Sequence, residues 1–255
     1  MVLTDTHTHL YYEVDTEKRA ALMQRSFDAG VSRLFLPNVD LASVSRVVDL
    51  VNTYPQNCFA MLGLHPCHVT PDWEAELEQI LSAKVGYPIY AIGEIGIDLY
   101  WDKSTLPLQQ KAFKKQIQHA KSLDLPIVIH CREAFDEVYA VLLEEQDEKL
   151  RGIFHCFTGT FEQAQRITAL GFYLGIGGVV TYKNSGLAQV VQQIELKHIV
   201  LETDSPYLTP VPYRGKPNES SYLSYIAQKI ADLHQVDMEY LSAVTTANSK
   251  LIFGV

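Results

Sequence analysis

The sequence predicts a single (β/α)8 TIM barrel that spans residues 1–255. Eight short runs rich in β-branched and apolar residues alternate with longer segments of helical periodicity, and this alternation is typical of a parallel α/β fold. The length of 255 residues is close to the roughly 250 residues typical of such barrels. Because no Ser/Gly-rich linker or run of charge divides the chain, we expect one domain.

Each predicted strand is a short run that ends in a polar or glycine-containing segment. The first run alternates Thr with His, which predicts a half-buried strand. The others are more uniformly apolar, as expected for strands covered on both faces. The eight predicted strands cover residues 2–9, 31–37, 57–64, 88–92, 125–129, 152–154, 172–176 and 199–201.

The segments between these strands carry apolar residues at helical spacing. Asp15 is placed to cap the first helix and Gly30 to end it. Ala20, Met23 and Phe27 fall on one face between them. The remaining predicted helices cover residues 41–54, 73–84, 108–123, 135–146, 161–170, 187–194, 222–233 and 238–253.

Nearly every unusual polar residue lies at the carboxyl-terminal end of a predicted strand. These residues are His7, His9, His65, Glu94, His130, His155 and Asp204. In a closed barrel the carboxyl ends of all strands meet at one face, where the active sites of this fold are built. A doubly wound open sheet is the alternative architecture, but it would not bring the ends of the first, fourth, fifth, sixth and eighth strands to one point. We therefore expect these side chains to converge.

Composition restricts the function classes. The formal net charge of −9 argues against a broad basic surface for gripping duplex DNA, so a phosphate substrate would be held locally. No apolar run approaches the roughly 20 residues of a transmembrane helix, and the first residues lack a basic segment followed by an apolar one. The four cysteines show no framework spacing, which predicts free thiols and a cytoplasmic location.

The polar residues at the strand ends suit metal binding. His7 and His9 stand two residues apart, and side chains at this spacing in a strand point to the same face. The further nitrogen and oxygen donors are His130, His155, Glu94 and Asp204, and such donors bind Zn²⁺, Mn²⁺ or Mg²⁺. Six ligands exceed the need of one catalytic ion that keeps a water position open. The sequence therefore predicts two ions bridged by Glu94.

A pair of ions can activate a shared water for attack on a substrate. Asp204 is the predicted acceptor of the proton of that water. Each residue also has a purely structural interpretation: His130 and His155 as core histidines, Glu94 as a turn residue, Asp204 as a helix cap. These interpretations do not explain why the residues fall at strand ends that converge in a barrel.

Three cations follow the same strand ends. Arg214 and Lys216 lie in the proline-rich segment after Asp204, and Arg132 follows His130 by two residues. Arginine binds phosphate through a planar pair of donors, so these residues could clamp an anion above the metal site. For Lys216 the alternative of a solvated surface cation stays open.

Seven motifs in order resemble those of TatD-related deoxyribonucleases, in the metal-dependent hydrolase superfamily. They are Asp5-Thr6-His7-Thr8-His9, Gly63-Leu64-His65-Pro66, Gly93-Glu94-Ile95-Gly96-Ile97-Asp98, His130-Cys131-Arg132, His155-Cys156-Phe157-Thr158-Gly159, Glu202-Thr203-Asp204-Ser205-Pro206-Tyr207 and Arg214-Gly215-Lys216-Pro217-Asn218. The resemblance runs from Asp5 to the C-terminus. It implies a TIM-barrel hydrolase of phosphoester bonds that acts on single-stranded DNA or from the 3′ end.

The resemblance also implies a role for each matching residue. The implied metal ligands are the pair His7 and His9, the shared Glu94, the second-ion histidines His130 and His155, and Asp204 at the active water. The implied residues of the substrate pocket are His65, Arg132, Tyr207 and Arg214. The chain departs from the family pattern at Cys67, a position often filled by histidine.

The leading hypothesis is a divalent-metal-dependent phosphodiesterase that cleaves single-stranded DNA or oligonucleotides, with no membrane and no obligate protein partner. A metal-dependent amidohydrolase or esterase acting on a small metabolite is the alternative, because the same activated water attacks carbonyl and phosphoryl centres and fold does not fix function. By the resemblance, Glu94 in place of a carboxylated lysine favours the nuclease branch. A metal-binding protein without turnover is the third possibility, and the candidate base Asp204 argues against it.

Overall fold

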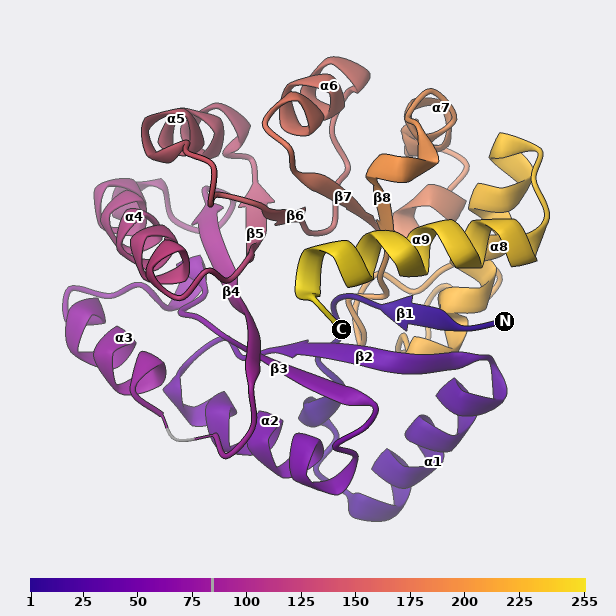
Figure 1. The fold of residues 1–255 in the computed structure, drawn as a ribbon, viewed down its shortest axis with the longest axis horizontal. Helices are drawn as coiled ribbons and strands as arrows, with labels where there is room; N and C mark the ends of the chain where they lie inside the picture. Colours follow the sequence, from indigo (N-terminus) through magenta and orange to yellow (C-terminus); the bar gives the residue numbers. More distant parts are fainter. Residues whose placement is uncertain (84) are drawn as a thin grey trace.

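Eight parallel strands form one continuous sheet in the order β1 to β8, and helices surround this sheet (Figure 1). The computed structural model describes residues 1–83 and 85–255. The sequential strand order confirms the predicted barrel and excludes the doubly wound sheet, in which the order reverses at a switch point. The strands are β1 (Leu3–Asp5), β2 (Val31–Pro37), β3 (Cys58–Leu62), β4 (Ile89–Asp98), β5 (Ile127–Arg132), β6 (Gly152–Phe154), β7 (Tyr173–Ile176) and β8 (Ile199–Leu201).

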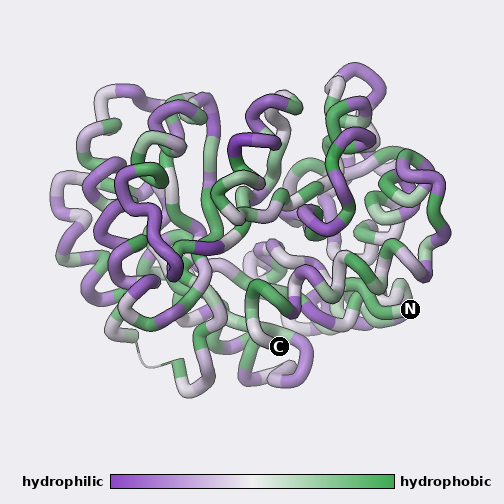
Figure 2. Tube along the Cα trace, turned by 45° about the horizontal axis from the view of Figure 1, so that its top comes forward, coloured by the Kyte–Doolittle hydropathy of each residue, from purple (hydrophilic) through white to green (hydrophobic). Residues whose placement is uncertain are grey.

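The helices pack their apolar faces on the sheet. Hydrophilic and hydrophobic residues alternate along them, as Figure 2 shows. The α-helices are α1 (Thr16–Asp28), α2 (Leu41–Thr53), α3 (Trp73–Leu81), α4 (Leu106–Ser122), α5 (Phe135–Glu145), α6 (Phe161–Ala169), α7 (Leu187–Val191), α8 (Leu223–His234) and α9 (Met238–Phe253). Short 3₁₀ helices are η1 (Leu10–Tyr12), η2 (Pro66–His68), η3 (Lys103–Thr105), η4 (Gly178–Thr181), η5 (Leu196–His198) and η6 (Ser220–Tyr222). Among the helices so described, none combines the length and the apolar character needed to cross a bilayer.

The predicted ends of the first helix are found in the structure. The Asp15 carboxylate accepts hydrogen bonds from the backbone N–H groups of Glu17 and Lys18 at 3.0 and 3.1 Å, which satisfies donors that a helix start leaves free. Gly30 follows the helix with a φ of +81°, a conformation that glycine adopts readily. The helix predicted over residues 73–84 ends earlier, at Leu81, and Lys84 lies outside the described residues.

Three elements differ from their predicted bounds in a way that matters for the polar residues. β1 ends at Asp5 because the backbone beyond it turns to two partners: Thr6 N–H donates to Leu201 of β8, and Thr8 N–H donates to Phe35 of β2. The first of these bonds closes the barrel between β8 and β1, and the second continues the pairing with β2. β4 runs on to Asp98 and β5 to Arg132, so Glu94 and His130 lie inside strands and not in the turns after them.

The inside of the barrel is filled by apolar side chains from the strands and is closed at its amino-terminal end by α9. Phe35 of β2 stacks on Phe59 of β3, with ring centroids 4.9 Å apart. From α9, Phe253 stacks on the same Phe35 ring at 3.8 Å. Asn248 of α9 donates to the carbonyl of Ile199 at the start of β8. The end of the chain is therefore part of the barrel core.

We expect Phe253→Ala to lower the free energy of unfolding by about 3–5 kcal/mol, since it removes a ring that is 6% exposed and leaves a cavity against Phe35. Urea denaturation followed by circular dichroism measures the change. Leu251→Ala is the matched control on the same helix, because Leu251 is 73% exposed, and its effect should stay within about 0.5 kcal/mol. Equal effects of the two substitutions would show that α9 does not close the core.

Candidate metal centre

Three histidines meet at the carboxyl-terminal end of the barrel. His7 and His9, just after β1, place their Nε2 atoms 3.3 Å apart, as their spacing predicts. His155, just after β6, stacks on His7 with ring centroids 3.5 Å apart and planes 17° from parallel. His7 is fully buried, and His9 and His155 are nearly so. Segments almost 150 residues apart in sequence thus supply one cluster of imidazoles.

The Glu94 carboxylate lies at the centre of this cluster and faces two groups of nitrogen atoms. Its Oε2 atom is 3.2 Å from His7 Nε2 and 3.6 Å from His9 Nε2. Its Oε1 atom faces the other side, with the distances 2.8 Å to His130 Nδ1, 3.4 Å to His65 Nε2 and 3.6 Å to His155 Nε2. The two oxygens of one carboxylate are therefore shared between two sets of donors.

Local backbone geometry brings Glu94 and His130 together. The pairing of β4 with β5 shifts register between Ile92 and Ile95, which is the irregularity of a bulge, and bulges re-aim side chains. Gly96 has a φ of +144°, and a Cβ atom there would collide with the carbonyl oxygen of His130. Only glycine lets the two strands approach this closely.

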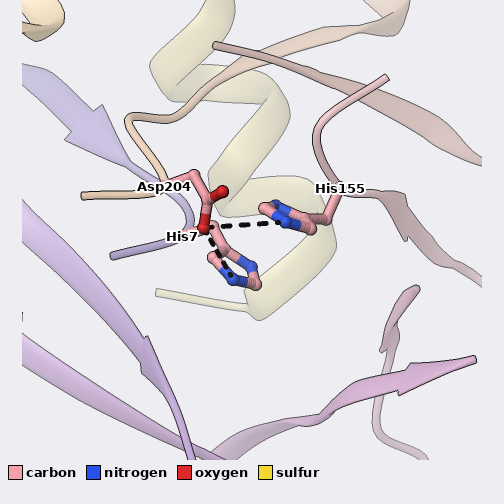
Figure 3. A group of neighbouring side chains, drawn as sticks. All are labelled: His7, His155 and Asp204. Carbon is pink, nitrogen blue, oxygen red and sulfur yellow. Dashed lines mark ion pairs between the residues drawn. The ribbon is translucent and has the colours of Figure 1, made fainter. Parts of the chain in front are cut away.

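Asp204 completes the cluster from the segment after β8 (Figure 3). Its Oδ1 atom lies 3.5 Å from His9 Nε2, 3.8 Å from His155 Nε2 and 3.9 Å from His7 Nε2. Asp204 has a φ of +55°, and its backbone N–H donates to the carbonyl of His7 at 2.9 Å. This further bond between the segments after β1 and β8 places the Asp204 carboxylate beside the histidines.

Three further residues lie against the outer nitrogen atoms of these imidazoles, and sequence reasoning assigned none of them a role. Tyr11 Oη lies 2.8 Å from His9 Nδ1, Asp98 Oδ2 lies 2.8 Å from His130 Nε2, and Glu202 Oε1 lies 3.0 Å from His155 Nδ1. Asp98 and Glu202 lie at the ends of β4 and β8 within the quoted motifs, so their position was a usable signal. Tyr11 had none, because it lies in η1 and turns back toward β2 to donate to the carbonyl of Pro37.

The Glu94 carboxyl is ionised although it is buried. Burial raises its pKa, but the surrounding histidines outweigh burial and hold the pKa of Glu94 well below its usual value. The histidines responsible are His65, His7 and His155, together with a hydrogen bond from His130. A carboxylate that stays anionic among several imidazoles offers oxygen and nitrogen donors together, which suits a divalent cation.

His155 carries the opposite shift. Burial lowers its pKa, but the carboxylates of Glu202, Glu94 and Asp204 outweigh burial and raise the pKa of His155 to about 10. The metal-free cluster therefore holds a proton on this imidazole at neutral pH. A metal ion bound through His155 would displace that proton, which is how metal affinity in such sites comes to depend on pH.

The donor atoms are close enough to hold metal ions. Within the described ranges, the side chains whose donor atoms lie within 4.8 Å of one another form the groups His7, His155 and Asp204; His7, His9 and Glu94; His65, Glu94 and His130; and His155, Cys156 and Glu202. Imidazole and carboxylate donors suit Zn²⁺, Mn²⁺ and Mg²⁺ to different degrees. The first three groups share Glu94 or His7, so they form one continuous centre.

His65 differs from the other histidines in its protonation. Its Nδ1 atom accepts a hydrogen bond from the backbone N–H of Cys67 at 3.1 Å, and burial lowers its pKa to about 4. The neutral ring therefore carries its proton on Nε2, the atom that faces Glu94 and His130. In this form His65 is a hydrogen-bond donor rather than a metal ligand. This contact comes from the backbone of Cys67 and does not depend on the identity of its side chain.

The other residues expected in the substrate pocket lie around the mouth of the barrel. Tyr207 is 53% exposed, and its ring lies 6.3 Å from that of His9. Arg132 and Arg214 are exposed and each stacks on an aromatic ring: Arg132 Cζ is 3.7 Å from the Tyr100 ring centroid, and Arg214 Cζ is 3.9 Å from the Tyr182 ring centroid. Both arginines are thus held in place while their charges face solvent.

A cavity of about 570 Å³ opens beside His9. It lies between α1 and the segment after β8, and its wall includes Tyr12, Lys18 and Lys216. The Tyr12 ring stacks on His9, with centroids 5.1 Å apart. The volume is within the ~300–1,000 Å³ of small-molecule sites.

Comparison with known proteins identifies one family along nearly the whole chain. Residues 4–254 match the family described as TatD related DNase. The metal-dependent hydrolase YabD of Bacillus subtilis (strain 168) is 38% identical over 258 residues, which cover all of both chains. The 3′-5′ ssDNA/RNA exonuclease TatD of Escherichia coli (strain K12) is 36% identical over 238 residues, which cover 90% of each chain.

A solved structure of a relative has the same fold. The crystal structure of YjjV, a TatD homologue from Escherichia coli K12, superposes with a TM-score of 0.92 at 29% identity, and the match covers 99% of this chain and 98% of that one. The family match and the shared fold therefore extend along the entire barrel. The chain belongs to the family of TatD-related DNases.

Proposed function

We propose that this protein is a divalent-metal-dependent phosphodiesterase that removes nucleotides from the 3′ end of single-stranded DNA. As a member of its family it is a metal-dependent hydrolase acting on ester bonds. The observation that supports the proposal most directly is the division of the Glu94 oxygens between two groups of imidazoles. Two-metal sites of this kind are common in enzymes that cleave phosphodiesters.

We assign two ions, Zn²⁺, Mn²⁺ or Mg²⁺, to the two sides of Glu94. His7, His9 and Asp204 would hold the first, and His130 and His155 the second. Bound in this way, the ions would lower the pKa of a water molecule and polarise the phosphoryl oxygens. Tyr11, Asp98 and Glu202 would fix the orientation of the imidazoles, as partners of ligating histidines do in other metal sites.

Asp204 is the proposed catalytic base. Burial raises the pKa of its carboxyl, but His155, His9 and His7 outweigh burial and lower it, so the group is ionised at neutral pH. Its exposed fraction is the largest among the carboxylates of the centre, 14% against 3% for Glu94. A carboxylate that is both ionised and open to the mouth can accept a proton from an attacking water.

The substrate would be held by donors at the rim of the centre. His65 presents its Nε2–H beside Glu94, where it can donate to a phosphoryl oxygen. Arg132, Arg214 and Tyr207 stand further out and would contact the flanking phosphates. So few contacts imply a shallow dependence of binding on salt, with a slope of roughly −0.7 per phosphate for a single strand.

An amidohydrolase or esterase acting on a small metabolite is not favoured. The relative from Escherichia coli (strain K12) that matches 90% of this chain is named an ssDNA/RNA exonuclease. That name applies to the relative. As part of the proposal, we extend the 3′-5′ direction of attack and the single-stranded substrate to this chain. The likeness to organophosphorus hydrolase, at 12% identity, concerns the fold alone.

A labelled oligonucleotide tests the proposal. Metal-loaded protein is incubated with single-stranded DNA carrying a label at the 3′ end or, in a parallel reaction, at the 5′ end. We expect early release of a labelled mononucleotide from the 3′-labelled strand and a ladder of shortening products from the 5′-labelled strand. Duplex DNA of the same sequence and chelator-treated protein are the controls. Absence of cleavage with Zn²⁺, Mn²⁺ and Mg²⁺ alike would contradict the proposed function.

A further inference from the structure

An exposed pair of aromatic residues stands beside the metal centre without a role in the chemistry described above. Tyr100 is 48% exposed and Trp101 is 72% exposed, in the segment between β4 and η3. Most tryptophan side chains are largely buried. We call Tyr100, Trp101 and the adjacent Arg132 the aromatic platform.

Hydrogen bonds tie the platform directly to the centre. The backbone N–H of Tyr100 donates to Asp98 Oδ1 at 2.9 Å. The other oxygen of that carboxylate lies 2.8 Å from His130 Nε2. Arg132 follows His130 by two residues and ends β5. The platform is therefore part of the mouth of the barrel and is held in a fixed position relative to Glu94.

The platform offers a planar apolar face and a cation at the same place. Arg132 Cζ lies 3.7 Å from the Tyr100 ring centroid and 5.7 Å from that of Trp101. The Trp101 ring meets Tyr100 edge-on, with centroids 4.8 Å apart and planes at 88°. Within residues 1–83 and 85–255, Arg132 makes no ion pair with a carboxylate, which leaves its guanidinium donors available for another anion.

An unpaired nucleobase with its phosphate matches these features. A base stacks on an aromatic face whatever its identity, and a phosphate accepts from a guanidinium. The neighbouring charges do not favour a general electrostatic attraction, because Asp102 directly precedes Lys103 and Glu133 directly follows Arg132. Binding would therefore depend on stacking and on one local cation, in agreement with the net charge of −9.

We propose that the aromatic platform binds an unpaired base of the substrate strand, next to the phosphodiester at the metal centre, and so selects single strands over duplexes. A base held in a duplex has no free face to stack on Trp101. This inference rests on the proposed nuclease function and adds to it a residue that determines substrate class.

Tryptophan fluorescence tests the contact directly. The chain has two tryptophans, and Trp73 is only 4% exposed, so quenching by an added strand reports on Trp101. Metal-loaded protein is titrated with a 12-residue phosphorothioate oligo(dT), which resists cleavage. We expect quenching in the wild-type protein and none in Trp101→Phe, although anisotropy of a labelled strand should show affinity within about threefold of wild type for that variant.

Kinetics separate a substrate contact from a structural role. For Trp101→Ala we expect the KM for oligo(dT) to rise on the order of tenfold, while kcat and the hydrolysis of bis(p-nitrophenyl) phosphate, which has no base, stay unchanged. Tyr240→Ala is the matched control, since Tyr240 is 55% exposed on α9, at the opposite end of the barrel. Trp101→Phe should restore most of the loss.

The outcomes are distinguishable. Three results would overturn the platform. The first is an unchanged KM for oligo(dT) in Trp101→Ala, and the second is an equal loss of activity on bis(p-nitrophenyl) phosphate. The third is a change in sedimentation, which would show that Trp101 contacts another protein chain. If wild-type protein shows quenching by oligo(dT) but cleaves no strand, the proposed nuclease function fails, and the platform stands only as a contact to single strands. If it cleaves strands without quenching, the platform alone is wrong.

Discussion

Asp204→Asn is expected to lower kcat on single-stranded DNA by about 10²–10⁴-fold, the usual contribution of a general base, and to leave most of the bound metal in place. Asparagine keeps the shape of the side chain and one oxygen that can still face His9 and His155. It has no basic oxygen to accept a proton. The other donors around Glu94 are untouched, so the centre should still assemble.

Elemental analysis and kinetics on the same preparation check this expectation. Asp232→Asn is the control, because Asp232 is an exposed residue of α8 whose carboxylate accepts a hydrogen bond from Gln228. It should change neither kcat nor metal content. If Asp204→Asn lost its metal together with its activity, the role of Asp204 would be to hold the ions alone, and its additional assignment as the base would be wrong.

The sequence predicted the barrel because local patterns are strong there. Short apolar runs and helical periodicity repeat along the chain, and the sequential strand order follows from them by simple packing rules. The convergence of His7, His9 and Glu94 was predictable for the same reason, since each follows or lies in a strand whose end is fixed by the fold. The metal-binding roles of these residues remain predictions that the variants above test.

What could not be predicted depends on contacts between distant segments. Glu202 reaches His155 only because β8 and β6 lie on either side of β7. Gly175 of β7 also leaves room for the Glu202 carboxylate, which a Cβ atom would displace. The protonation of His65 is set by the backbone N–H of Cys67, and no residue type encodes that bond. Such partners become visible only when the positions of all strands are known.

Glu94→Gln is expected to have the largest effect of any single substitution at the centre. The amide keeps one oxygen and replaces the other by an NH₂ group, which cannot bind a cation. The NH₂ group would then face one set of imidazole nitrogens, where the wild-type protein has a negatively charged oxygen. We expect the protein to lose at least one ion per chain and kcat/KM on single-stranded DNA to fall by at least ~10³-fold, since metal ions contribute several kcal/mol to such reactions and each 1.36 kcal/mol corresponds to tenfold.

Glu202→Gln is the control that separates the loss of a metal ligand in Glu94→Gln from the mere loss of a buried negative charge. Glu202 is fully buried and approaches the outer nitrogen of His155, but it does not face the group formed by His7 and His9. Its neutralisation should weaken metal binding by about 10–100-fold, as substitutions of outer partners do, and added metal should restore activity. Excess metal should not rescue Glu94→Gln. Rescue of both variants to wild-type activity would mean that the Glu94 carboxylate is not shared between two ions, and the binuclear centre would have to be abandoned.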